Sequence, residues 1–279
     1  MTVNSTSPYA EPRAVASVED CIFYHTMDLP RVGLVHGQWD LRPAPGDYLG
    51  HVDFSGKRAL DVGTASGFLC FEMERQGAEV VAYDLSEHSE SWDIVPFGGW
   101  PAETMATERA AGMGRINKGY WLAHAALGSH ARMAYGSVYQ LPSSIGPVDV
   151  AVFGAILVHL RDPFLALQRA LALTTETVVI TEPAGRAAKV IGRLPGWAAH
   201  RVASAPWLPA KLGFLPDPAL GLPDESWWRL TPWALARMVR VLGFDVASIT
   251  FHNQLYLGAP CPMFTLVGRR RKGTRKPGV

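Results

Sequence analysis

Two glycines and two carboxylates at a fixed spacing are the residues of this sequence whose types most clearly suggest chemistry. The segment Asp61-Val62-Gly63-Thr64-Ala65-Ser66-Gly67 follows an apolar run and precedes a helical pattern. Its glycines allow a sharp turn in which a ligand can approach bare backbone. Asp84 lies 21 residues after Gly63, at the end of the next apolar run. A carboxylate there can accept hydrogen bonds from both hydroxyls of a ribose, so the pattern predicts a nucleoside site.

The turn lacks the pattern of a pyrophosphate site. A dinucleotide-binding turn has the form G-x-G-x-x-G, and Ala65 and Phe68 stand where its second and third glycines would be. Gly56-Lys57 is followed by Arg58 without a preceding glycine-rich loop, which excludes a P-loop. The residues therefore fit a nucleoside without phosphate, and S-adenosylmethionine (SAM) is the obvious one. A nicotinamide-dependent dehydrogenase is the weaker alternative.

The elements that must position these residues alternate between strands and helices. Apolar runs typical of strands lie at residues 58–63, 79–85, 133–138, 148–154, 177–183, 245–251 and 263–269. Their uninterrupted Val, Ala, Ile and Phe residues indicate strands that are buried on both faces, as in parallel sheets. The sequence therefore predicts an α/β fold with a doubly wound, mainly parallel, seven-stranded sheet.

The segments outside this alternation predict the domain organisation. It comprises a flexible lead-in at 1–17, an N-terminal cap at 18–54, the nucleoside-binding domain at 55–270 and a basic tail at 271–279. Residues 183–232 hold eight prolines and four tryptophans. A long irregular insertion of this kind is typical of a lid or binding loop. It ends at Thr231-Pro232, an N-cap followed by Pro at the first helical position.

Charge and composition limit the partners. The net charge of +1 includes six Lys/Arg at residues 269–276, so the remaining 20 Lys/Arg face 25 Asp/Glu. Such an acidic body disfavours a nucleic-acid partner, since phosphate neutralisation supplies most non-specific affinity. No uncharged apolar run of 18 residues occurs, the start lacks the order of a signal peptide, and the three cysteines are scattered. The sequence therefore predicts a cytoplasmic protein without a membrane partner. No metal-ligand spacing occurs, so we expect no metal.

Four sequence blocks resemble a known family. They are FYHTMDL at 23–29, GQWDLR at 37–42, the segment 60–85 with its glycine turn, and GAILVHLRDP at 154–163. In this order they are similar to class I SAM-dependent methyltransferases, over roughly residues 55–270. They most resemble the subgroup that contains the tRNA wobble-uridine carboxymethyltransferase and many methyltransferases of bacterial secondary metabolism. The resemblance implies a Rossmann-like fold and SAM as cofactor.

The resemblance also implies a set of cofactor contacts. Asp61, Gly63 and Gly67 would line the methionine end of SAM, and Asp84 would bind its ribose. The remaining expected contacts flank the adenine, close the site, adjoin these positions or lie in the cap: Ser137, Val138, Gly154, Ala155, Thr64, Ala65, Leu85 and, in the cap, Trp39.

One position departs from the tRNA-modifying enzyme. Val158 stands where that enzyme has a tyrosine that acts on its carboxylated cofactor. With the acidic body, this favours ordinary SAM and a small-molecule acceptor. A tRNA wobble-uridine methyltransferase and a non-catalytic SAM-binding protein are the alternatives, and a homodimer stays open.

Three residues are candidates for catalysis. Tyr24 and His25 lie in the cap that the family folds over the SAM pocket, where His25 could take a proton and Tyr24 could orient the acceptor. His159 follows the fourth strand, near the place where acceptors dock in this fold. Packing is the alternative role for all three.

The acceptor side contains aromatic and polar candidates. Trp228, His252 and Asn253 are candidates for substrate contact, because tryptophan stacks on flat rings and the other two end a strand with polar groups. The alternatives are a lid that packs on its own domain for Trp228 and an ordinary strand-end turn for His252 and Asn253. The acceptor favoured is an indole- or phenol-like secondary metabolite, with methylation at carbon, nitrogen or oxygen.

Overall fold

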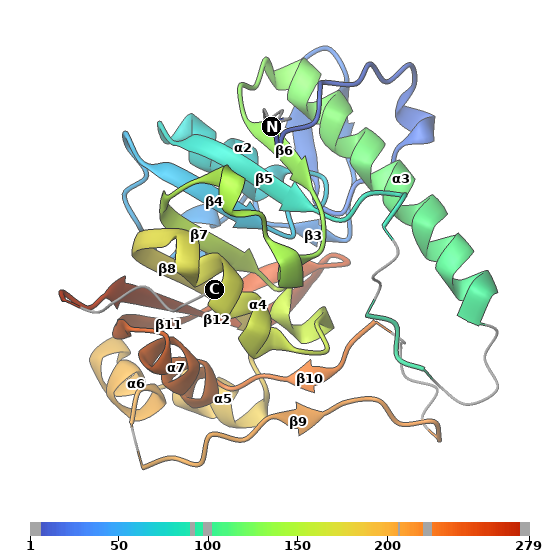
Figure 1. The fold of residues 1–279 in the computed structure, drawn as a ribbon. Coiled ribbons are helices and arrows are strands. Elements are labelled where there is room, and N and C mark those ends of the chain that lie inside the picture. Colours follow the sequence, from blue (N-terminus) through green and yellow to red (C-terminus); the bar gives the residue numbers. More distant parts are fainter. Residues whose placement is uncertain (1–6, 90–92, 97–101, 206, 220–224, 274–279) are drawn as a thin grey trace, which may run out of the picture.

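The computed structural model describes residues 7–89, 93–96, 102–205, 207–219 and 225–273. Its centre is an eight-stranded sheet with the order β3-β11-β12-β8-β7-β4-β5-β6 (Figure 1). The strands are β3 (Trp39–Asp40), β4 (Arg58–Val62), β5 (Glu79–Asp84), β6 (Arg132–Tyr135), β7 (Val148–Gly154), β8 (Thr174–Pro183), β11 (Phe244–Tyr256) and β12 (Ala259–Arg270).

The sheet reverses its direction of growth beside β4. From β4 the chain adds β5 and β6 on one side, and it then crosses back to add β7 and β8 on the other. All four of these neighbouring pairs are parallel, whereas β12 and β11 are antiparallel to their neighbours. In such a sheet a crevice opens at the carboxyl ends of the strands where the order reverses. The fold therefore places a ligand site after β4 and β7.

Helices cover both faces of the sheet (Figure 1). They are α1 (Pro45–Tyr48), α2 (Phe68–Arg75), α3 (Ala102–Leu127), α4 (Pro163–Leu173), α5 (Arg186–Ile191), α6 (Gly196–Ala203) and α7 (Pro232–Val241). The sheet separates two hydrophobic cores: Ala59 of β4 packs with α2 and α3, and Leu60 and Val62 pack with α4 and α7. This burial of both faces is the reason that Ala59, Leu60 and Val62 of β4 are all apolar.

The N-terminal cap is tied to the glycine turn. The cap contains a two-stranded ribbon, β1 (Met27–Leu29) with β2 (Gly33–Val35), and it also supplies β3 at the sheet edge. Ser66 is fully buried, and its Oγ accepts hydrogen bonds from the backbone nitrogens of Tyr24 at 3.1 Å and His25 at 3.2 Å. One side chain of the turn therefore fixes the position of the Tyr24-His25 pair.

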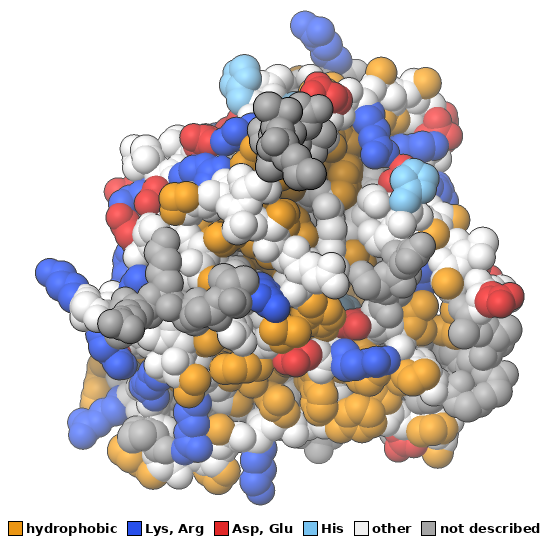
Figure 2. Space-filling model, viewed as in Figure 1, with side chains coloured by type: hydrophobic (Ala, Val, Ile, Leu, Met, Phe, Trp, Pro, Cys, Tyr) orange, Lys and Arg blue, Asp and Glu red, His pale blue; other side chains and the backbone are white. Residues whose placement is uncertain are grey.

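The insertion after β8 contains α5, α6 and a short ribbon of β9 (Gly213–Phe214) with β10 (Trp228–Arg229). Its end is as predicted, because Thr231 caps α7 by accepting a hydrogen bond from the backbone nitrogen of Ala234 at 3.3 Å. Figure 2 shows hydrophobic side chains interspersed with Lys and Arg over the lower left of the molecule, where Figure 1 places α6 and α7. None of the helices in the described ranges has the length and apolarity that crossing a membrane requires.

The seven predicted strands and their mainly parallel arrangement are confirmed. The sheet gains an eighth strand, because Trp39 of the cap pairs with Tyr256 of β11. Residues 7–17 of the predicted flexible lead-in are attached to the domain. The backbone nitrogen of Ala10 donates a hydrogen bond to the backbone oxygen of Met133 at 2.8 Å. Residues 1–6 of the lead-in and 274–279 of the predicted tail lie outside the described residues.

Candidate active site

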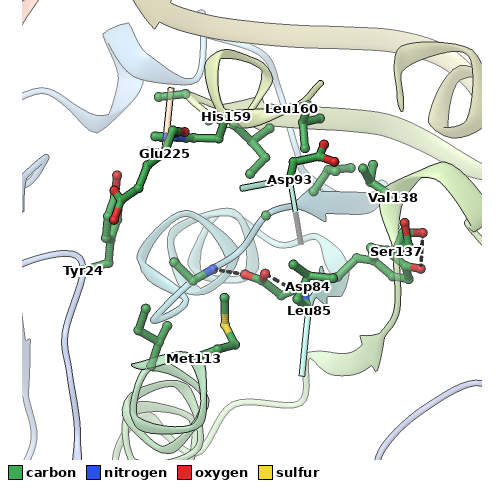
Figure 3. Close-up of a pocket in the computed structure, with 18 of the residues that line it drawn as sticks. Tyr24, Asp84, Leu85, Asp93, Met113, Ser137, Val138, His159, Leu160 and Glu225 are labelled. Carbon is green, nitrogen blue, oxygen red and sulfur yellow. Dashed lines mark hydrogen bonds between the residues drawn. The ribbon is translucent and has the colours of Figure 1, made fainter. Parts of the chain in front are cut away.

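A pocket opens at the carboxyl ends of β4, β5, β6 and β7, where the strand order reverses. The cap, α3 and the insertion close its sides. Its lining residues are Tyr24, Val62, Gly63, Ala65, Tyr83, Asp84, Leu85, Asp93, Ile94, Arg109, Met113, Ile116, Gly136, Ser137, Val138, Tyr139, Gly154, Ala155, Ile156, His159, Leu160 and Glu225. Figure 3 shows Tyr24, His159 and Glu225 toward one end, Ser137 and Val138 toward the other, and Asp84 between them.

The glycine turn has the backbone that the sequence predicts. Gly63 and Gly67 have φ of +76° and +92°, which L side chains rarely adopt. A Cβ on Gly63 would lie 2.8 Å from Cγ1 of Ile156, and one on Gly67 would lie 2.4 Å from Cε2 of Phe71. Both positions therefore need glycine for conformation and for space. The resulting turn directs the backbone nitrogen of Ala65 toward Asp84.

Asp84 is fixed at the middle of the pocket wall. Its Oδ2 accepts a hydrogen bond from the backbone nitrogen of Ala65 at 2.6 Å, and its Oδ1 accepts one from that of Leu85 at 2.7 Å (Figure 3). Burial raises the pKa of Asp84 to about 6, against the effect of these two donors. A carboxylate has about four acceptor sites, so each oxygen of the ionised side chain can accept a further hydrogen bond.

Asp61 supports the turn from below and is only 1% exposed. Its Oδ2 accepts a hydrogen bond from Oγ1 of Thr64 at 2.7 Å. Burial raises the pKa of Asp61 to about 7. Asp61, Thr64 and Gly67 are predicted cofactor contacts, and the structure places all three behind the pocket wall. From this position the three residues support the turn.

The end of the pocket at Ser137 and Val138 is built from backbone and apolar surface. The hydroxyl of Tyr83 donates to the oxygen of Ser137 at 3.0 Å, which ties the loop after β6 to β5. The hydroxyl of Tyr139 hydrogen-bonds the carboxylate of Asp93. Since Leu85 and Val138 line this end, it offers apolar walls to a flat ring.

His159 lies at the opposite end, with one ring nitrogen anchored. Its Nδ1 is 2.5 Å from the backbone oxygen of Glu225. A carbonyl oxygen only accepts hydrogen bonds, so Nδ1 must carry the hydrogen. Burial lowers the pKa of His159 from its ordinary value of 6.5, which keeps the ring neutral at pH 7. In this tautomer Nε2 carries the lone pair and can accept a proton.

Tyr24 lines the pocket at the same end (Figure 3). Burial raises the pKa of its hydroxyl, so the hydroxyl stays protonated at neutral pH. It can therefore donate a hydrogen bond to a ligand oxygen. His25, its neighbour, is 6% exposed and does not line the pocket. Burial lowers the pKa of His25 to about 3, and its ring meets that of Tyr24 edge-on at 5.2 Å.

Several pocket residues were not singled out from the sequence. Arg109, Met113 and Ile116 are spaced as i, i+4 and i+7 along α3, and all three line the pocket. That spacing was the available signal. Glu225 of the insertion forms an ion pair with Arg109, and the pair closes the pocket between α3 and the insertion. Nothing in the sequence indicates this pairing, because 116 positions separate the partners.

The insertion is held against the pocket by Trp227. Its backbone nitrogen donates to the oxygen of Val158 at 2.9 Å, and its Nε1 donates to the oxygen of Asp93 at 2.7 Å. The guanidinium of Arg161 lies 4.9 Å from the centre of the indole ring. These contacts fix the neighbouring Glu225, and through it the orientation of His159.

Four other predicted site residues lie outside the pocket lining. Trp39 is buried in the cap, and Nε1 of Trp228 donates to the oxygen of Arg161 at 3.1 Å. His252 binds Oγ1 of Thr265 at 2.8 Å on the face of the sheet. Asn253 is exposed on β11. The strand end predicted at residue 251 is the reason, because β11 continues to Tyr256 and carries His252 and Asn253 within the strand.

Comparisons with known proteins decide the family. A family described as a methyltransferase domain matches residues 41–248. The ubiquinone biosynthesis O-methyltransferase of Neisseria meningitidis serogroup A is 30% identical over 224 residues, which cover 76% of each chain. The chain belongs to this methyltransferase family. The finer subgroup that contains the tRNA wobble-uridine enzyme stays a prediction.

Two solved structures resemble this methyltransferase in fold. The magnesium protoporphyrin IX methyltransferase from Synechocystis PCC 6803 with bound S-adenosylhomocysteine (SAH) is 12% identical with a TM-score of 0.49, over 83% of this chain and 82% of that chain. The 1,6-didemethyltoxoflavin-N1-methyltransferase from Burkholderia thailandensis, with bound 1,6-didemethyltoxoflavin and SAH, is 17% identical with a TM-score of 0.47, over 83% of this chain and 78% of that chain.

The methyltransferase is a SAM-dependent enzyme. The donors and acceptors of its pocket fit this cofactor: a fixed carboxylate at Asp84 suits ribose hydroxyls, and the apolar walls at Leu85 and Val138 suit an adenine ring. Gly63 and Gly154 present bare backbone between these and the His159 end. Among the described residues, no cluster of three or more His, Cys, Asp or Glu could hold a metal ion.

A buried glutamate of β8 gives this methyltransferase a testable pH dependence. Glu182 is fully buried, its Oε1 accepts a hydrogen bond from the backbone nitrogen of Leu157 at 2.9 Å, and its Oε2 has no partner among the described residues. Burial raises the pKa of Glu182 from 4.5 to about 8. The folded protein therefore binds a proton here that the unfolded chain releases above pH 4.5. This contribution makes stability fall as pH rises from about 4.5 to 8.

Glu182→Gln is expected to remove that loss, because glutamine resembles the protonated acid. The free energy of unfolding of the variant, relative to wild type, should increase between pH 5 and pH 8 by up to a few kcal/mol. Urea denaturation at both pH values measures the difference. Glu176→Gln, on the same strand but exposed, should give no such trend. A constant difference between wild type and Glu182→Gln would contradict the prediction.

Proposed function

We propose that this enzyme transfers the methyl group of SAM to a hydroxyl of a small aromatic acceptor, with His159 as the general base. The observation that carries the proposal is the neutral His159 whose Nδ1 is held by the Glu225 carbonyl. A phenolic hydroxyl loses its proton during methylation, so a neutral imidazole beside it accelerates the transfer. The name of the curated O-methyltransferase relative supports oxygen as the methylated atom.

The proposal assigns the cofactor to the row of residues along the strand ends. Asp84 would accept hydrogen bonds from the ribose, and Leu85, Ser137 and Val138 would enclose the adenine. The backbone of Gly63, Ala65, Gly154 and Ala155 would line the remainder. Trp39, Asp61, Thr64 and Gly67 would act through the turn and the cap that they support. When bound, SAM supplies a methyl group activated by a sulfonium.

The acceptor would occupy the end of the pocket at Tyr24 and His159. Met113, Ile116 and Leu160 also line the pocket, and their apolar surface suits an aromatic ring and excludes water. The Tyr24 hydroxyl would donate to the acceptor oxygen and hold it in line with the methyl group, since alignment supplies much of the rate in such displacements. His25 would position Tyr24 by packing beneath it, and the proton would pass to His159. Trp228, His252 and Asn253 take no part.

A panel of matched acceptors tests the proposal. The enzyme is incubated with SAM labelled in the methyl group and with phenols, catechols and hydroxyindoles, each paired with the analogue that lacks the free hydroxyl. We expect label in at least one hydroxylated acceptor and none in its partner, with mass spectrometry placing the methyl group on oxygen. Label on carbon or nitrogen only, or label in tRNA alone, would contradict the proposed function.

A further inference from the structure

The outer part of the insertion exposes large aromatic side chains. Trp197 is 73% exposed, Trp207 75% and Phe214 60%, while Val190 is 63% exposed. Exposed tryptophan is costly, since most of its surface is apolar. Four exposed apolar side chains within residues 190–214 mark a surface that meets something other than water. None of these four residues lines the pocket, so the pocket does not account for them.

Local structure presents these residues outward. In α6, Ala199 and Ala203 are buried, and Trp197 and Arg201, spaced as i and i+4, lie on the exposed side. The guanidinium of Arg240 in α7 donates to the oxygen of Ser204 at 3.1 Å, which fixes the loop after α6 beside α7. Helices α5 and α6 therefore carry Val190 and Trp197, whereas Trp207 follows α6 and Phe214 lies on β9.

Positive charge is interleaved with these aromatic residues. Residues 184–216 contain five of the chain's 26 Lys/Arg and none of its 25 Asp/Glu. Lys189, Arg193, Arg201 and Lys211 are exposed, and none of them pairs with an acidic side chain among the described residues. In Figure 2, Lys and Arg side chains stand between hydrophobic ones over α6 and α7. We call this set (Val190, Trp197, Trp207, Phe214 and the four cations) the basic aromatic surface.

The chemistry of this surface favours a lipid bilayer over a protein. Protein interfaces are depleted in lysine, and a basic surface without acids requires an acidic partner. Exposed tryptophan with interleaved cations matches the headgroup region, where indoles sit at the interface and cations meet lipid phosphates. We propose that the basic aromatic surface docks this enzyme peripherally on an anionic membrane. The expectation of no membrane partner rested on the lack of a spanning segment, which peripheral docking does not need. The proposal does not depend on the acceptor.

Vesicle flotation with the full chain tests the proposal. We expect binding to vesicles of phosphatidylcholine mixed with phosphatidylglycerol and much weaker binding to phosphatidylcholine alone. Lys189→Ala and Arg201→Ala should each lower the partition coefficient roughly fivefold, and Trp197→Ala and Trp207→Ala roughly tenfold each. Tryptophan emission should shift to the blue on binding, and this shift should be smaller in the Trp197→Ala Trp207→Ala double variant.

Matched controls separate this surface from general stickiness. Leu34 and Leu257 are 48% and 69% exposed away from the insertion, and Lys118 is exposed on α3. Leu34→Ala, Leu257→Ala and Lys118→Ala should bind anionic vesicles as wild type does. Equal binding of wild type to both kinds of vesicle, or no binding to either, would overturn the proposal. So would a wild-type dimer in sedimentation that Trp197→Ala Trp207→Ala dissociates, since the surface would then join two copies of the chain.

Discussion

Replacing Asp84 by alanine is expected to weaken SAM binding by roughly 10²- to 10³-fold, because two charge-assisted hydrogen bonds to the ribose would be lost. The carboxylate of Asp84 is oriented in advance, because the backbone nitrogens of Ala65 and Leu85 hold both of its oxygens in place. Because the side chain is already ordered, little conformational entropy is lost when the ribose binds. Titration calorimetry with SAM and with SAH measures the loss.

The controls for Asp84 address folding and charge separately. Glu176→Ala removes an exposed acid near the amino end of β8, whereas the pocket opens at the carboxyl ends of the parallel strands. This variant should leave SAM affinity unchanged. Because burial raises the pKa of Asp84 to about 6, wild-type affinity should fall as pH drops below about 6, and Asp84→Ala should lack that fall. Thermal unfolding checks that the Asp84→Ala variant is folded. A folded variant that binds SAM within threefold of wild type would refute the ribose role.

The sheet was predictable because its strands are buried on both faces. The strand predicted at 148–154, with its apolar run at 150–153, coincides with β7, and the glycine turn after β4 has the positive φ angles that its residues require. Short strands lack such a signal. Trp39 and Asp40 join the sheet only because β11 extends to Tyr256 and offers them an edge. Two residues have no periodicity to detect, so this pairing is a tertiary effect.

The acceptor end of the site was less predictable, because its contacts join distant segments. His159 meets Glu225 across 66 positions, and the last part of that span is a proline-rich insertion whose path no local pattern determines. The position of His25 in the cap made it a candidate base, but in the structure its side chain is buried and does not line the pocket. Gly37 is part of the reason: a Cβ there would lie 2.4 Å from the carbonyl carbon of His25, so the chain crosses directly over this residue. Sequence spacing cannot reveal such a crossing.

His159→Ala should lower kcat by roughly 10²- to 10⁴-fold, the usual contribution of general acid–base catalysis, while SAM affinity stays near that of wild type. In wild type, kcat at saturating SAM should fall as pH drops through the pKa of His159, which burial holds below its ordinary 6.5. The reason is that only the neutral ring can accept the proton. His159→Gln should lack this acidic limb.

Two further variants locate the effect at the imidazole. His130→Ala changes an exposed histidine and should leave kcat and its pH profile unaltered. Glu225→Ala keeps the backbone carbonyl that binds Nδ1 but removes the carboxylate paired with Arg109. If the carbonyl sets the tautomer, as the geometry requires, Glu225→Ala should retain the acidic limb of the kcat–pH profile. Its kcat should fall far less than that of His159→Ala. A His159→Ala enzyme within threefold of wild-type kcat would show that water, and not this ring, takes the proton.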